Sequence, residues 1–205
     1  AVDVKAMMNR PDDLTIASAN ANVLGIDVGA VGVGSSQADV YLRPTITSTV
    51  GSLDQSAIGV SIMANTVSVD ATSGLGQGKA KSTAGSGKFI GATYTKSEQT
   101  VDVDVRTTIG RGSKVTGKET ITLNSDAGTT DLDNYADAYV VSVVSGQNAD
   151  AFETINSTAS TEIGEKATLF SLGHVKVSAE NEIDISSKAD TVYVGGVGVS
   201  AALAK

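Results

Sequence analysis

The sequence predicts an all-β fold and, within that class, a parallel β-solenoid (β-helix) built from repeats of about 54 residues. Three observations support this prediction: a short strand pattern that recurs at a fixed spacing, small-residue runs that recur in the same order, and apolar–polar alternation without a sustained helical stripe. The alternative is a β-sandwich subunit that polymerises by strand exchange, because the same period also suits two half-domains.

The recurring strand is an apolar-polar-apolar triplet. It appears as Val67-Ser68-Val69, Ile121-Thr122-Leu123 and Val175-Lys176-Val177, each 54 positions after the one before. Val2-Asp3-Val4 has the same pattern and marks an earlier copy. We therefore expect one elongated repeat domain over residues 1–205, with approximate repeats 2–66, 67–120, 121–174 and a partial 175–205.

Two further markers recur in phase with the triplet. Thr108-Ile109-Gly110 is followed 54 positions later by Glu162-Ile163-Gly164. Runs of Gly, Ala, Val and Ser form the other marker, at residues 28–36, 84–92, 138–146 and 194–202. Because Gly lets two layers of backbone approach closely, these runs are predicted to be strands with a thin layer of side chains between them. In the open, such strands are weak in register and prone to pair with other chains.

Between the markers, apolar and polar residues alternate, which indicates strands with one solvent-exposed face. Val101-Asp102-Val103-Asp104-Val105 places three valines on one side and two carboxylates on the other. Asp102 and Asp104 are therefore predicted to face solvent.

The length of the repeat predicts how often the chain winds. Strands average about 5–6 residues, so a 54-residue unit is expected to hold two or three coils of roughly 18–27 residues each. About ten coils stacked at about 4.8 Å then predict a rod roughly 50 Å long.

Composition excludes several classes of function. The net charge of −8 disfavours nucleic acid and anionic lipid as partners, since both need a basic surface. The chain has no Cys, so burial and repeated hydrogen bonding have to stabilise it in place of disulfides. No stretch has the roughly 18 apolar residues of a membrane span, and no membrane insertion is expected. Both ends lie in strand-like pattern, which suggests a segment of something longer.

Two groups of residues are candidate sites. Asp131, Asp133, Asn134 and Asp137 crowd a segment that reads as a turn, and their oxygens would suit Ca²⁺. Their spacing matches neither an EF-hand nor the Ca²⁺-binding nonapeptide, and a solvated turn is the favoured interpretation. The segment Leu75–Lys88 is rich in Gly, Lys and Ser but lacks the spacing of a phosphate-binding loop. It is predicted to be a loop and a place of partner contact.

No residue is predicted to be catalytic or to bind a cofactor. His174 is the only histidine and has no Cys beside which to hold a metal, so it is interpreted as an exposed corner residue. No nucleophile signature accompanies it.

The run from Ile163 to Ala179 carries a resemblance to a known family. An Ile-Gly turn leads through Ala167 and Leu169 to Gly173 and then to Val175-Lys176-Val177, with a Gly/Val-rich run at 194–202. This resembles the repeats of filamentous-haemagglutinin-like and leukotoxin-type filamentous adhesins, which are large secreted exoproteins of Gram-negative bacteria. The resemblance implies secretion to the bacterial surface, a parallel β-helical shaft, attachment to a cell-surface or host receptor, and no catalytic residues.

Three functions follow as hypotheses. The first is a non-enzymatic structural and adhesive shaft segment, whose partners are neighbouring repeats and a receptor. The second is a self-assembling extracellular filament or matrix subunit, whose partners are copies of itself. The third is a carbohydrate-active enzyme on a β-helix, which ranks last because paired acids and aromatic sugar platforms are not evident among five Tyr, three Phe and no Trp.

Overall fold

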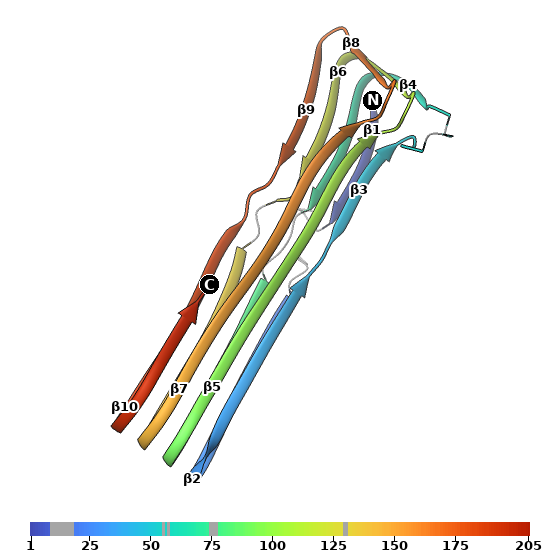
Figure 1. Ribbon diagram of the computed structural model, residues 1–205. Helices are drawn as coiled ribbons and strands as arrows, with labels where there is room; N and C mark the ends of the chain where they lie inside the picture. Colours follow the sequence, from blue (N-terminus) through green and yellow to red (C-terminus); the bar gives the residue numbers. More distant parts are fainter. Residues whose placement is uncertain (9–18, 55, 57, 74–77, 129–130) are drawn as a thin grey trace.

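The computed structural model describes residues 1–8, 19–54, 56, 58–73, 78–128 and 131–205 (Figure 1). In these ranges the chain forms β-strands and no helix. The strands belong to two sheets, and the chain passes from one sheet to the other and back as it proceeds. All the strand pairings described are parallel. The all-β prediction is thereby confirmed.

The first sheet contains the triplets identified in the sequence. Its strands are β1 (Val2–Met8), β4 (Ser61–Ser73), β6 (Lys114–Asp126), β8 (Thr168–Ser171) and β9 (His174–Glu180). The order is β1-β4-β6-β8, and β9 also pairs with β6. Val2 pairs with Val67, Val67 with Ile121, and Ile121 with Val175. The starts of the four repeats therefore form one column across the sheet.

The second sheet contains the longer strands. These are β2 (Ala19–Leu42), β3 (Thr45–Val50), β5 (Gly78–Ile109), β7 (Asp131–Ile163) and β10 (Asp184–Ala204). The order is β10-β7-β5-β2, and β3 also pairs with β5. β5 and β7 pair from Gly78 with Leu132 to Ile109 with Ile163, a constant offset of 54. Figure 1 shows these strands lying side by side along the length of the molecule.

The repeat winds less often than its length predicts. Each 54-residue unit adds one passage through each sheet, so the expectation of two or three coils per repeat is wrong. The mean strand length misleads here because β5 and β7 have 32 and 33 residues. Four neighbouring strands are roughly 15–20 Å across the stack, not 50 Å.

Apolar side chains from both sheets meet in the core. One cluster combines Val67, Ile121 and Leu123 of the first sheet with Val50 and Ile109 of the second. A second cluster holds Val101, Val103 and Val105 together with Ile46, Ala71, Ala127 and Leu132. Asp102 is exposed and Asp104 half-buried on the opposite face of β5, which confirms the predicted alternation.

Beyond this core the long strands fold back on themselves. In β5 the hydroxyl of Thr95 donates to the hydroxyl of Ser82 at 2.8 Å, and in β7 the side-chain amide of Asn134 donates to the carbonyl of Phe152 at 2.6 Å. The side chains between the two halves are mainly Ala, Ser, Thr and Gly. The small-residue runs therefore lie where two layers approach closely, as predicted.

Candidate functional site

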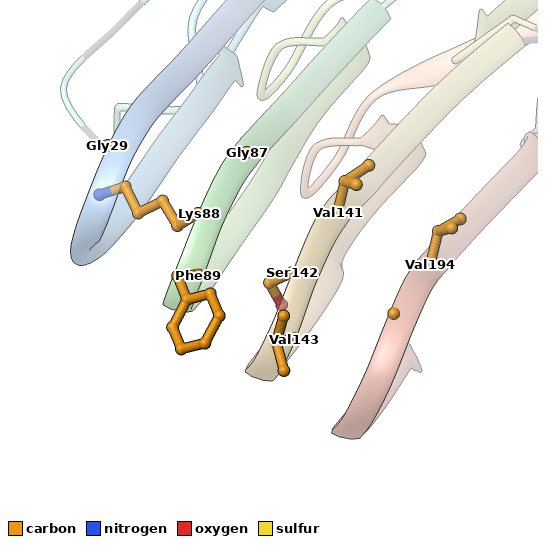
Figure 2. A pocket seen from close by; sticks show the side chains of 9 residues that line it. Gly29, Gly87, Lys88, Phe89, Val141, Ser142, Val143 and Val194 are labelled. Atoms are coloured by element: carbon orange, nitrogen blue, oxygen red, sulfur yellow. The ribbon is translucent and has the colours of Figure 1, made fainter.

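The point where the long strands fold back is the most distinctive surface of the molecule (Figure 2). Alternation breaks there: Phe89 and Ile90 both face outward in β5, and Val143 and Val144 do so in β7. Two outward residues in succession reverse the phase of the strand, and this lets the chain return along itself. The register brings the equivalent positions of four strands together, so that Val31, Ile90, Val144 and Val197 form one row.

Large apolar side chains face solvent along this edge. We call the surface they form the tip surface; its members are Val28, Val31, Phe89, Ile90, Val141, Val143, Val144, Val194 and Val197. Val28 is 78% exposed, Val31 71% and Phe89 62%. A contiguous exposed apolar surface of this kind is uncommon unless it contacts something.

An open groove of about 570 Å³ crosses the tip surface. Phe89, Val141, Val143 and Val194 line it, together with the backbone of Gly29, Gly87 and Gly195. In Figure 2 the Phe89 ring projects from the fold-back, and Val141 and Val194 project from neighbouring strands. The walls are mostly apolar, so the groove suits an apolar side chain or an alkyl group better than an ion.

The charged groups at the tip neutralise one another. Lys88 is the only charged residue in the ranges 28–34, 86–92, 138–146 and 191–199. Its ammonium group contacts the carboxylate of Asp27 in β2, and its side chain is almost completely buried. The tip surface therefore presents no exposed charge in these ranges, which disfavours a polyanionic ligand.

The Ca²⁺ candidates do not share one face. Asp131–Asp137 opens β7 and is a strand, so the expected turn is wrong. Strand alternation places Asp133 and Asp137 on the outer face and Asn134 on the buried inner face. Asp133 lies 3.7 Å from the ammonium group of Lys79, and Asp131 pairs through its backbone with Asp184. In the described ranges, no group of three or more His, Asp or Glu side chains is placed to hold a metal ion.

The other sequence candidates lie apart from the tip groove or differ from expectation. His174 is exposed and opens β9 beside the bend at Gly173, as expected. Gly78–Lys88 is part of β5 and pairs with β2 on one side and β7 on the other, so the loop prediction is wrong for these residues. Leu75 to Gln77 lies outside the described residues.

Sequence reasoning missed one acidic residue. Glu153 lies on the inner face of β7, in register with the fully buried Gln99. Its carboxyl oxygens are covered and have no hydrogen-bond partner among the described residues. Burial, and secondarily the negative charge of Asp133, raises the pKa of Glu153 to about 7. The sequence held a signal for this burial. Alternate residues of a strand share a face, so Glu153 is expected to lie on the same inner face as Ala149 and Ala151.

Comparisons with known proteins leave the site to be interpreted from its own geometry. No model of a known protein family, no curated protein and no solved structure matches the chain. No helix in the described ranges is long and apolar enough to cross a membrane.

Proposed function

We propose that this chain is a parallel β-solenoid that serves as a non-enzymatic structural and adhesive shaft segment of a secreted or surface-exposed bacterial protein. The observation that carries the proposal is the register. Each repeat adds one passage through each of two parallel sheets, and equivalent apolar residues stack in buried columns. A stack of this kind can be extended by further repeats that all use the same type of contact, and it provides length and rigidity.

The pairing pattern favours the solenoid over the β-sandwich alternative. Consecutive passages through a sheet are neighbours in that sheet, as in β4-β6 and β5-β7. The long connection that parallel pairing requires is supplied by the passage through the other sheet. A strand-exchanged sandwich has no need for this fixed offset of 54 residues.

An adhesive role is supported by the tip surface. The fold positions small residues inward and valines outward along one edge, although burying the valines would contribute more to stability. The resulting apolar row is repeated on neighbouring strands, which suits low-affinity contacts made many times over. The partner we propose is a cell-surface or host receptor with an apolar contact region.

The tip surface supports binding more than catalysis. Its outward groups are Val, Phe and Ile, which neither donate nor accept protons. Among the carboxyl groups of the described residues, Glu153 has a raised pKa, and its carboxyl oxygens are covered.

Adhesion of coated beads tests this function. Beads carrying the chain are expected to bind cultured epithelial cells more than albumin-coated beads do. The double variant Val141→Ser with Val143→Ser should lose that excess, whereas Thr154→Ser, on the outer face of the same strand away from the tip, should retain it. Binding at the albumin level would contradict an adhesive role, and equal binding of both variants would contradict the tip surface as the contact.

Electron microscopy of the purified chain tests the architecture separately. Short plates with their long axis along the strands are expected. A compact globule would contradict the solenoid.

Release of reducing sugar from a panel of polysaccharides would instead support the enzyme hypothesis.

A further inference from the structure

The inner strands β5 and β7 carry almost no charge around their fold-back. Between Asp137 and Asp150, β7 has no charged residue. Between Lys81 and Lys96, β5 has only Lys88, which is buried in an ion pair. We call residues 82–95 of β5 and 138–149 of β7 the uncharged end. Both strands have a neighbour on each side, so the outward faces of the uncharged end do not depend on where the stack begins or stops.

The uncharged end has a definite depth. The fold-back divides residues 138–149 into two halves of about six residues, and strand residues advance about 3.3 Å each, so the band is about 20 Å deep on either face. One leaflet of a lipid bilayer has a hydrocarbon layer about 15 Å thick. The uncharged end is therefore deep enough to enter one leaflet and too shallow to cross both.

The outward side chains nearest the fold-back have no hydrogen-bonding groups. They are Gly85, Gly87, Phe89, Ile90 and Ala92 in β5, and Val141, Val143, Val144 and Gly146 in β7. Figure 2 shows the Phe89 ring and Val143 projecting at the fold-back itself. Interfaces between proteins carry about one hydrogen bond per 100–200 Å². A surface that offers neither donors nor acceptors suits acyl chains better than it suits a protein.

The backbone of the uncharged end is also paired up to the fold-back. Residues 85–88 of β5 pair with residues 139–142 of β7 on one side and with residues 26–29 of β2 on the other. Ile90 pairs with Val144 and with Val31. Unpaired N–H and C=O groups are costly next to hydrocarbon, so this pairing meets a requirement of lipid contact.

A tyrosine marks the boundary of the uncharged end on each face. Tyr139 lies two positions from Asp137 and is 46% exposed, and Tyr94 lies two positions from Lys96 and is 38% exposed. Because the two halves of each strand face each other, the two rings lie on opposite outer faces. Tyrosine is enriched at the level of lipid head groups, where its ring contacts apolar groups and its hydroxyl reaches water.

The charges at the boundary suit a zwitterionic head group. On the inner strands they are Lys81 and Lys96 together with Asp137 and Asp150, two of each sign. A phosphatidylcholine head group also carries one charge of each sign, so the boundary is electrostatically complementary to it. The net charge of −8 on the whole chain disfavours an anionic lipid.

We propose that the tip surface docks on a phosphatidylcholine bilayer, with Phe89 and Val143 among the acyl chains and Tyr94 and Tyr139 at the level of the head groups. The inference rests on the adhesive role proposed for the tip surface and names the component of the cell surface that it contacts. The contact is peripheral and needs no membrane span. Because the uncharged end recurs on neighbouring strands, weak contacts add up along the stack.

Flotation of the whole chain with phosphatidylcholine vesicles tests the proposal. The wild type should float with the vesicles. The double variant Val141→Ser with Val143→Ser should bind at least about tenfold more weakly, because two apolar side chains lose their contact with lipid. Thr154→Ser, on the outer face of β7 away from the tip, should bind like the wild type. A wild type that does not float, or a double variant that floats equally, would overturn the inference.

Lipid composition tests the choice of head group. Replacing half of the phosphatidylcholine by phosphatidylglycerol should weaken binding, because the chain and the vesicle then both carry net negative charge. Stronger binding to the phosphatidylglycerol vesicles would contradict a zwitterionic partner.

A tryptophan reporter locates the contact without relying on the double variant. The chain has no Trp, so Val143→Trp and Thr154→Trp each introduce a single one, at the tip and away from it. With phosphatidylcholine brominated in its acyl chains, Val143→Trp should lose most of its fluorescence and Thr154→Trp should keep it. Equal quenching of the two reporters, or quenching of neither, would overturn the inference.

The bead assay separates failure of this inference from failure of the proposed function. Beads that bind cells through Val141 and Val143, from a chain that ignores the vesicles, would retain the adhesive role and assign a protein or glycan receptor in place of lipid. A chain that binds neither cells nor vesicles would contradict both.

Discussion

Lys88 of β5 and Asp27 of β2 form an ion pair across the fold-back, and the two side chains differ in exposure, at 4% and 36%. Removing one partner of a buried pair is costly when the other cannot reach water. We therefore expect Asp27→Ala to lower the free energy of unfolding by about 3 kcal/mol, because it leaves the Lys88 ammonium buried and unpaired. Lys88→Met should cost about 1 kcal/mol, since Asp27 remains partly hydrated.

Urea denaturation of the two variants measures this difference. Lys79→Met is a suitable control, because Lys79 and Asp133 form a more exposed pair at 3.7 Å. Its cost should be under about 0.5 kcal/mol. Equal costs for Asp27→Ala and Lys88→Met would show that the exposure difference is unimportant.

Glu153 predicts a pH dependence of stability. Burial and the charge of Asp133 raise its pKa to about 7 from an ordinary value of 4.5. Between these two values the folded protein holds a proton that the unfolded chain has lost, so stability falls as pH rises through this window. The fall should be on the order of 1 kcal/mol, because the carboxyl oxygens are covered but the residue as a whole is only partly buried, and nearby solvent weakens the effect.

Glu153→Gln isolates this contribution. The variant should be about as stable as the wild type at pH 4 and more stable at pH 8, as measured by thermal unfolding. Glu162→Gln, an exposed position on the same strand, provides the control and should retain the wild-type profile. An unchanged pH profile in Glu153→Gln would assign the dependence to other groups.

The columns of the first sheet predict a gradient of mutational cost. Leu123 is fully buried between Val69 and Val177, whereas Val177 ends the column. Leu123→Ala should destabilise the fold by about 3 kcal/mol, and Val177→Ala in the monomer by under about 1 kcal/mol. Chemical denaturation at low protein concentration gives both values, and similar costs would contradict the one-sided exposure of β9.

The period of the fold could be predicted from sequence, but its winding could not. Equivalent residues such as Val67 and Ile121 stack directly, so selection for a buried column leaves a spacing that is visible without a structure. That one strand continues through a fold-back leaves only a two-residue signal in the sequence. The available signal was a pair of apolar residues between inward ones, as in Lys88-Phe89-Ile90-Gly91 and Ser142-Val143-Val144-Ser145.

The candidate site was harder to predict for a related reason. Alternation was interpreted as apolar residues inside and polar residues outside, which holds for Val101 and Asp102 in the core. At the tip most inward positions hold Gly, Ala or Ser, so Val28 and Val31 face out while Gly32 faces Lys88. Whether a valine fits on the inner side of a strand depends on the distance between the layers, and that distance is set by the tertiary structure.

Two glycines, Gly110 beside a turn and Gly87 inside β5, predict opposite outcomes when each is changed to Ala. A Cβ at Gly110 would lie 2.3 Å from the backbone nitrogen of Ser52 and 2.7 Å from the backbone carbon of Gly51, whereas a Cβ at Gly87 would meet nothing within 4 Å. Gly110 also donates its N–H to the carbonyl of Val50 at 2.7 Å, and this contact joins two neighbouring turns. Gly110→Ala should therefore destabilise the fold by about 2 kcal/mol or more, because backbone has to move. Gly87→Ala should stabilise it by about 0.5 kcal/mol, since alanine loses less conformational entropy on folding. Urea denaturation of both variants checks the prediction, and a loss of stability in Gly87→Ala would mean that the outer face of β5 is more crowded at this position than the structure places it.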